Sequence, residues 1–166
     1  MDTFLSSFIV IILLVILYVY FEGRSYQVKF VKSNINGKEY LVRNLDDKVD
    51  AANLMANMKN RIYKLQNYLN ENNNDDKRVK RLNEKFNSKN ITESTKNNKY
   101  TSYSVNKGEK IVLCIRSRDE NEKLIDINTL MFVTLHELAH IMTISIGHTE
   151  EFWNNFKFLL KKSVNI

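Results

Sequence analysis

The sequence is poor in residues that break regular structure or cross-link a chain. It contains no proline, four glycines and one cysteine among 166 residues. The lack of proline and the scarcity of glycine exclude collagen-like, PxxP-type and glycine-rich linker architectures. A single cysteine, Cys114, excludes an internal disulfide framework and a cysteine-rich zinc finger. With 43% hydrophobic and 27% charged residues, the composition also excludes a wholly disordered chain.

The N-terminal stretch lacks charge. Residues 3–21, TFLSSFIVIILLVILYVYF, are almost entirely apolar, and a helix of that length is about long enough to cross a bilayer core of roughly 30 Å. The flanks lack the basic start and the small-residue cleavage site of a signal peptide. The sequence therefore predicts a transmembrane anchor over residues 1–24. A cleaved signal and a buried core helix are the weaker alternatives.

Charge predicts the orientation and the partners of the chain. Arg24, Lys29 and Lys32 follow the apolar stretch, and no Lys or Arg precedes it. The positive-inside rule then places the C-terminal domain of a single-pass membrane protein in the cytoplasm. The whole chain has a net charge of +6, and its excess of basic residues would draw the domain towards an anionic membrane surface. It also permits nucleic acid as a partner, without favouring it.

Residues 25–166 predict one α+β domain, because strand-like alternation and helix-like periodicity both occur in them. The long helix is the clearest element, since apolar residues recur at three- and four-residue steps from Val49 to Leu69. The predicted elements are a hairpin (26–32 and 39–43), a long helix (46–70), a shorter helix (79–86), an irregular segment (88–98), a second hairpin (100–105 and 110–116), a helix that begins near Asp126 or Asn128 and runs past His140, and a final helix capped by Thr149.

The most informative stretch is HELAH, at residues 136–140. Residues four apart lie on one face of a helix, so His136 and His140 can direct both imidazoles at one metal ion. Glu137 is turned by about 100° from His136, which places its carboxylate beside the ion, where it can hold and deprotonate a bound water. Two imidazoles suit Zn²⁺, which activates water and polarises a carbonyl. The pattern predicts a hydrolytic zinc site with Glu137 as its catalytic residue.

His148 is the predicted third ligand. In a continued helix it would lie about 12 Å along the axis from His140, too far to share an ion. Gly147 directly precedes it, however, and allows the positive φ that ends a helix and turns the chain. Three protein ligands and one water make the open arrangement of a catalytic zinc site. Glu151 is the alternative third ligand, since some HExxH proteins use a glutamate on the next helix.

These residues carry a family resemblance. HELAH followed by GHTEEFW at residues 147–153 resembles the small zincin metallopeptidases of the WLM, SprT-like and YgjP-like group. The sequence is more similar still to predicted metallopeptidases of nucleocytoplasmic large DNA viruses, over about residues 100–160. The resemblance implies a zincin-like fold, a protein or peptide substrate, and an edge strand beside the metal helix to which substrate backbone adds. Either 110–116 or 100–105 could supply that strand. A viral source would make the membrane that of the host or virion.

Together these features predict a membrane-anchored zinc metallopeptidase. Residues 1–24 form the anchor, and residues 25–166 form a zincin-like α+β domain of helices and a small antiparallel sheet. The rival hypothesis is a non-catalytic, membrane-anchored interaction protein that zinc only stabilises, but such a protein does not need Glu137. A third hypothesis, a basic adaptor in which HExxH is fortuitous, predicts no stoichiometric zinc.

Overall fold

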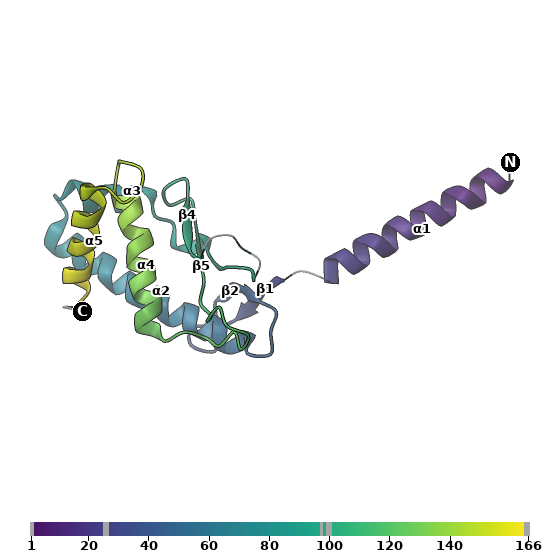
Figure 1. The fold of residues 1–166 in the computed structure, drawn as a ribbon, viewed down its shortest axis with the longest axis horizontal. Coiled ribbons are helices and arrows are strands. Elements are labelled where there is room, and N and C mark those ends of the chain that lie inside the picture. Colours follow the sequence, from purple (N-terminus) through teal and green to yellow (C-terminus); the bar gives the residue numbers. More distant parts are fainter. Residues whose placement is uncertain (1, 25–26, 97, 99–100, 165–166) are drawn as a thin grey trace.

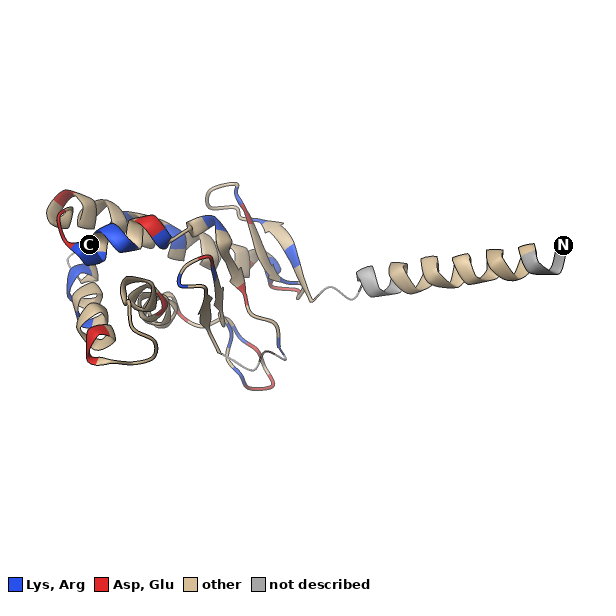
Figure 2. Cartoon of the chain, turned by 90° about the horizontal axis from the view of Figure 1, so that it is seen from above, with Lys and Arg blue, Asp and Glu red and all other residues tan. Residues whose placement is uncertain are grey.

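The computed structural model describes residues 2–24, 27–96, 98 and 101–164 (Figure 1). Helix α1 (Asp2–Arg24) forms where the apolar run occurs, and it extends away from the rest of the chain. The described side chains of α1 carry no charge, whereas Lys, Arg, Asp and Glu occur throughout the remaining elements (Figure 2). The division into parts 1–24 and 25–166 stays a prediction.

The structure does not support the predicted membrane anchor. Within the described part of the chain, no helix combines the length and the apolar character that a bilayer crossing requires. The prediction of a span over residues 3–21 is therefore wrong. The predicted location, a single-pass membrane protein with a cytoplasmic C-terminal domain, depends on this span and is wrong as well, and the predicted membrane partner is not supported.

The first predicted hairpin is confirmed. Strands β1 (Val28–Lys32) and β2 (Glu39–Arg43) pair antiparallel, with Val31 opposite Tyr40. Both of these side chains are buried, because they lie on the face of the hairpin that packs against the helices. The hairpin thereby covers one end of the hydrophobic core.

The second sheet differs from the prediction in one strand. Its order is β3 (Ile91–Glu93), β5 (Lys110–Leu113) and β4 (Tyr103–Val105). The β4–β5 hairpin is antiparallel as predicted, but β3 runs parallel to β5, so the sheet is mixed. Strand β3 lies in the segment 88–98 that was predicted to be irregular, after a 3-10 turn at Ser88–Asn90. Three residues are too few for alternation to stand out from the polar residues around them.

The last two helices, α4 (Ile127–Met142) and α5 (Glu150–Ser163), begin at their predicted caps. The Asp126 carboxylate accepts hydrogen bonds from the backbone N–H groups of Asn128 and Thr129, and the Thr149 hydroxyl accepts one from Phe152 N–H. Such caps satisfy N–H groups that have no partner within the helix. Helices α2 (Lys48–Asn73) and α3 (Lys77–Lys85) precede α4.

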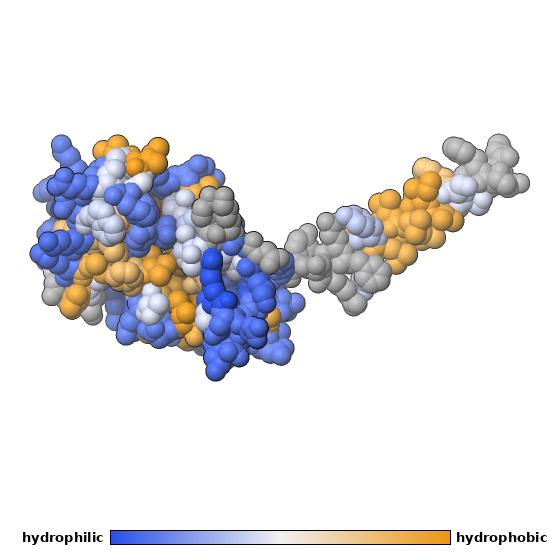
Figure 3. All heavy atoms as spheres, in the orientation of Figure 1, coloured by the Kyte–Doolittle hydropathy of each residue, from blue (hydrophilic) through white to orange (hydrophobic). Residues whose placement is uncertain are grey.

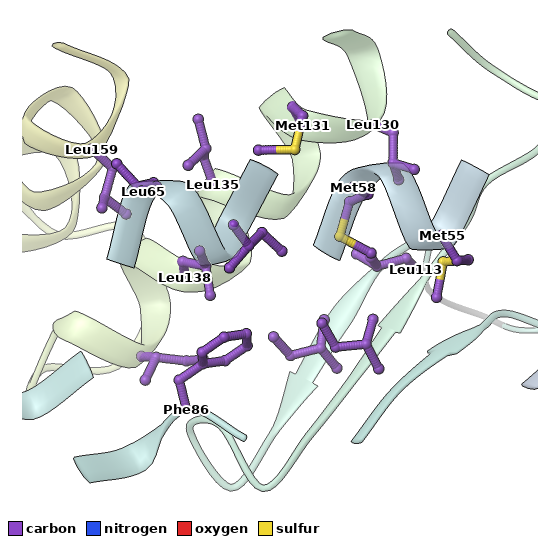
Figure 4. Close-up of a cluster of buried hydrophobic side chains, with 14 of the residues drawn as sticks. Met55, Met58, Leu65, Phe86, Leu113, Leu130, Met131, Leu135, Leu138 and Leu159 are labelled. Atoms are coloured by element: carbon purple, nitrogen blue, oxygen red, sulfur yellow. The ribbon is translucent and has the colours of Figure 1, made fainter. Parts of the chain in front are cut away.

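Helix α4 lies at the centre of the domain. It packs against α2, α3 and α5, and its buried face includes Leu135 and Leu138 (Figure 4). Met55 and Met58 of α2 and Leu113 of β5 belong to the same buried cluster. Full burial of each such side chain stabilises the fold by about 1.5–3 kcal/mol. Contacts on several sides fix α4 in place, so it is a rigid support for the residues on its remaining face.

Lys59 is a half-buried cation on α2, and its replacement is expected to stabilise the fold. Its Nζ lies 4.9 Å from the centre of the Tyr40 ring. Burial, and secondarily the charge of Lys38, lower the pKa of Lys59 to about 8. Discounted for partial exposure, this shift corresponds to about 1–2 kcal/mol, so Lys59→Met should raise the free energy of urea unfolding at pH 7 by about that amount. Exposed Lys64→Met is the matched control.

The pH dependence gives an independent check on Lys59. Between the folded pKa of about 8 and the ordinary value of 10.5, the folded state has lost the Lys59 proton while the unfolded state retains it. Stability rises with pH wherever the unfolded state binds more protons. Wild type should therefore approach Lys59→Met in stability as the pH is raised through this window. A difference that stays constant from pH 7 to 10 would contradict the explanation.

Candidate metal centre

Helix α4 brings the first two predicted ligands together. His136 and His140 are one turn apart on its partly exposed face, with their ring centroids 4.9 Å apart. The helical spacing produces this arrangement directly, since residues four apart project from the same side. The opposite face of the helix is buried in the core, which fixes the orientation of both histidines.

The loop between α4 and α5 brings His148 back to this face. Gly147 has a φ of 85°, a left-handed conformation that glycine adopts without strain. His148 Nε2 lies 3.1 Å from His136 Nε2. One ring nitrogen from each of His136, His140 and His148 lies within 4.8 Å of the others. The three predicted ligands therefore converge, although the chain turns between the second and the third.

Phe152 forms the floor beneath the three imidazoles. Its ring centroid lies 4.3 Å from that of His140, 4.8 Å from His136 and 4.7 Å from His148. The side chain is fully buried. Its contact with all three rings was not predicted, because it depends on how α5 crosses α4. Phe152 therefore links the core of the domain to the orientation of the histidines.

Glu137 faces the sheet beside the histidines. Its carboxylate is buried and accepts a hydrogen bond from the backbone N–H of Ser104 in β4. Burial raises the pKa of Glu137 to about 7, and the Ser104 N–H opposes this rise. Glu137, the three histidines and Ser104 line an open hollow of about 320 Å³. The hollow is large enough for a short piece of extended chain.

Of the two segments proposed as edge strand, β4 occupies that position. It pairs with β5 on one side, whereas β5 lies between β3 and β4. The residues of β4 line the hollow, and among them the Tyr103 hydroxyl accepts a hydrogen bond from Asn98 at 3.2 Å. The other side of β4 therefore faces the histidines and is the side to which an extended peptide could add.

Glu151, the alternative third ligand, lies elsewhere. Its Oε1 accepts a hydrogen bond from Ile144 N–H at 2.9 Å. Its Oε2 accepts bonds from Ser145 N–H at 3.0 Å and from the Ser145 hydroxyl at 2.7 Å. These bonds lower the pKa of Glu151 to about 2. Both carboxylate oxygens are thus directed at the α4–α5 loop, and Glu151 is not part of the histidine group.

The electrostatics of the site favour neutral imidazoles. The pKa of His140 is lowered to about 4, chiefly by burial and then by the positive charges of His136, His148 and Lys107. Burial and then His148 also lower the pKa of His136. Neutral imidazole is the form that binds metal ions. At neutral pH, His136 and His140 therefore each offer a ring nitrogen with a free lone pair.

The donor set fits zinc. Two nitrogens at the usual zinc distance of about 2.0–2.1 Å from one tetrahedral ion lie about 3.4 Å apart. The 3.1 Å between the Nε2 atoms of His136 and His148 is close to this separation. Three imidazoles also leave a fourth position for water, as catalytic zinc sites do. The residues present could therefore hold such an ion with small movements of the rings.

The fold and the site define a metallopeptidase-like protein. An HExxH helix, a histidine beyond the following turn and an edge strand beside them lie in one α+β domain. Residues 42–166 match the WLM domain, and the chain belongs to the WLM family. Membership in this family of metal-dependent proteases supports a metallopeptidase-like function. The predicted family resemblance is confirmed, and it extends well before residue 100.

Relatives of the chain occur in large DNA viruses, and a yeast protein has a similar fold. Protein R325 of Acanthamoeba polyphaga mimivirus is 37% identical over 172 residues, which cover the whole of this chain and 87% of the relative. Protein 136R of Invertebrate iridescent virus 6 is 43% identical over 60 residues, or 36% of this chain and 33% of the relative. The crystal structure of Wss1 from Saccharomyces cerevisiae has a similar fold, with a TM-score of 0.56 at 24% identity over 73% of this chain and 82% of that one.

Sequence reasoning missed two features of the site. Trp153 is one of them: its side chain is 54% exposed, and its ring centroid lies 5.8 Å from that of His148. Lys107, in the β4–β5 turn, contacts the loop that carries His148. A turn lysine carries no sequence signal for such a contact, because its partners are backbone carbonyls distant in the chain.

Proposed function

We propose that this protein is a zinc metallopeptidase. His136, His140 and His148 hold Zn²⁺, and Glu137 is the general base. The observation that carries the proposal is the convergence of three imidazole nitrogens within 4.8 Å of one another, with a buried carboxylate on the next residue of the same helix. Family membership supports the reaction class.

Each residue has a distinct role in the proposed reaction. Bound zinc supplies an activated water and polarises the scissile carbonyl. Glu137 accepts a proton from the attacking water and then donates it to the amine of the leaving peptide. The hydrogen bond from Ser104 N–H fixes the carboxylate in an orientation suited to both transfers. The buried position of Glu137 keeps competing water away from it.

The substrate is a protein or peptide in extended conformation. Strand β4 is the outer strand of its sheet and lies beside the hollow, where an extended chain could bind alongside it. Such binding recognises the main chain of the substrate and tolerates different substrate side chains. This suits a protease that acts on unfolded or flexible segments. The hollow of about 320 Å³ beside β4 is open to solvent.

Metal binding is the first test. The full chain should bind one zinc per molecule, measured by elemental analysis after dialysis against a weak chelator. His136→Ala and His140→Ala should each reduce the zinc content to background, and His148→Ala should weaken binding strongly, because two imidazoles alone are a poor zinc site. Glu150→Gln, an exposed change on α5, is the control that should retain the metal.

Three outcomes decide between the hypotheses. Absence of stoichiometric zinc from wild type would contradict the proposed site and favour a fortuitous HExxH. Loss of zinc in Glu151→Gln without any loss in His148→Ala would assign the third ligand to Glu151. Stoichiometric zinc together with no hydrolysis of a broad peptide library would favour a non-catalytic protein in which zinc has a structural role.

A further inference from the structure

The loop that carries His148 has little apolar packing to hold it. It connects the end of α4 to Thr149 at the start of α5, and Ile144 and Ile146 in it are 73% and 89% exposed. Figure 3 shows apolar surface at the tip of this loop, where it faces solvent. Gly147 has no neighbouring atoms within 4 Å of the place a Cβ would occupy. Apart from the contact of the His148 ring with Phe152, apolar packing therefore does little to fix the course of this loop.

Lys107 binds this loop from the β4–β5 turn. Its Nζ donates hydrogen bonds to three successive backbone carbonyls: Thr143 at 2.8 Å, Ile144 at 2.7 Å and Ser145 at 2.6 Å. An ammonium group has three N–H donors, so this arrangement uses all of them. One side chain thus satisfies three successive backbone acceptors of the loop that follows α4.

The turn that carries Lys107 is itself fixed in position. Asn106 and Lys107 have φ values of 46° and 52°, and Gly108 has a φ of 117°. A Cβ at Gly108 would lie 2.6 Å from the Lys85 carbonyl oxygen, so the turn packs directly against the end of α3. Only glycine permits that approach. The ammonium group therefore reaches the loop from a rigid support.

Glu151 binds the same loop from the opposite end with the opposite charge. Its carboxylate accepts from the N–H groups of Ile144 and Ser145 and from the Ser145 hydroxyl. The Ser145 hydroxyl also lies 2.7 Å from the hydroxyl of Thr149, the residue after His148. The carbonyls of Ile144 and Ser145 are thus held by a cation, and their N–H groups are held by an anion.

We propose that Lys107 and Glu151 are positioning residues that hold the α4–α5 loop so that His148 can complete the metal site. The inference rests on the proposed function and deepens it. Because Lys107 lies in the turn two residues after the end of β4, it ties the position of the third ligand to that of the edge strand. The side chain of Lys107 then couples the metal site to the edge strand β4, the proposed substrate-binding edge.

The test compares matched pairs of variants of the full chain. Lys107→Met and Glu151→Gln should each raise the dissociation constants for Zn²⁺ and Co²⁺ by about 10- to 100-fold, the range found for residues that orient metal ligands. Exposed neighbours supply the controls, Lys110→Met and Glu150→Gln, which should bind as wild type does. The visible spectrum of bound Co²⁺ should change in the two loop variants, because the geometry of the third ligand changes. Lys107→Arg should restore part of the affinity, since guanidinium can also donate to several carbonyls.

A second readout needs no metal. Trp153 is the single tryptophan of the chain, and its ring lies beside that of His148. In the metal-free protein, Lys107→Met and Glu151→Gln should alter the Trp153 emission and increase its quenching by acrylamide, while both controls match wild type. Circular dichroism identifies any variant that fails to fold, in which case the other variant decides.

The outcomes separate this inference from the proposed function. If wild type binds no metal, the proposed function fails, and the Trp153 comparison still decides whether the two residues hold the loop. If wild type binds metal and both variants keep its affinity and Co²⁺ spectrum, the positioning role is wrong. Unchanged Trp153 emission and quenching in both folded variants would likewise overturn it.

Discussion

A chain that carries Glu137→Gln is expected to bind zinc as wild type does and to hydrolyse peptides about 10²- to 10⁴-fold more slowly, the usual contribution of a general base. Glutamine has nearly the same shape as glutamate, and its carbonyl oxygen can still accept the hydrogen bond from Ser104 N–H. What it cannot do is accept a proton from water. The change therefore removes the chemical role of Glu137 and preserves its place in the fold.

The measurement uses the zinc-loaded full chain and a broad library of fluorogenic peptides. Zinc content is measured on the same samples, so that a loss of activity can be separated from a loss of metal. Glu150→Gln makes the same chemical change at an exposed position on α5 and should leave the rate unchanged. Equal activity of wild type and Glu137→Gln would show that Glu137 is not the base.

The position of Glu137 also bears on the non-catalytic alternative. Burial of a carboxylate is unfavourable unless its charge is compensated. A purely structural zinc site requires the histidines and gains nothing from a buried acid on the next residue. A catalytic site requires an acid there. The burial of Glu137 beside Ser104 is therefore more easily understood if the residue acts on a metal-bound water.

The parts of the site that sequence reasoning predicted are those encoded locally. His136 and His140 follow from helical spacing, and the turn before His148 follows from Gly147, so the neighbouring sequence is sufficient. Lys107 was not predictable in the same way, because it is 36 to 38 residues from the carbonyls that it binds. Which turn faces which loop is decided by packing of the whole domain, here by the contact between Gly108 and the end of α3.

The same distinction holds for the fold. The elements that were predicted have a clear local signal. Helix periodicity or a capping residue marks α2, α4 and α5, and alternation on both sides of a turn marks the two hairpins. Strand β3 has three residues and a parallel partner that lies about twenty positions away, so its sequence carries almost no signal. The apolar run of residues 3–21 predicted a helix correctly and a membrane span wrongly, because an apolar composition is shared by several kinds of helix.

The second large effect is expected in stability, at the buried ion network that joins the two sheets. The side chains of Arg116 and Glu93 are 4% and 1% exposed, and Arg116 Nε lies 2.7 Å from Glu93 Oε1. The other Glu93 oxygen accepts a hydrogen bond from the backbone N–H of Arg43 in β2 at 2.6 Å. Asp47, just before α2, binds the two terminal nitrogens of Arg116 at 2.6 and 2.8 Å. One carboxylate thus connects β2, β3 and the segment after β5.

Glu93→Ala should lower the free energy of unfolding by about 3–5 kcal/mol, as expected when one partner of a buried ion pair is removed. Two losses add up: Arg116 keeps its charge with one carboxylate instead of two, and Arg43 N–H loses its acceptor in the interior. Because whole domains are stable by only about 5–15 kcal/mol, much of the stability would be lost. Urea unfolding followed by circular dichroism measures the effect.

The control is an ion pair of the same charges at the surface. Lys80 Nζ lies 3.5 Å from Asp75 Oδ1, with side chains 56% and 96% exposed. Asp75→Asn should change the free energy of unfolding by less than about 1 kcal/mol, because water screens such pairs. The double variant Glu93→Met with Arg116→Met should lose less stability than the sum of the two single changes, since no buried charge remains unpaired. Strictly additive losses in the free energy of unfolding would show that Glu93 and Arg116 stabilise the fold independently. The ion network would then not be what connects the two sheets.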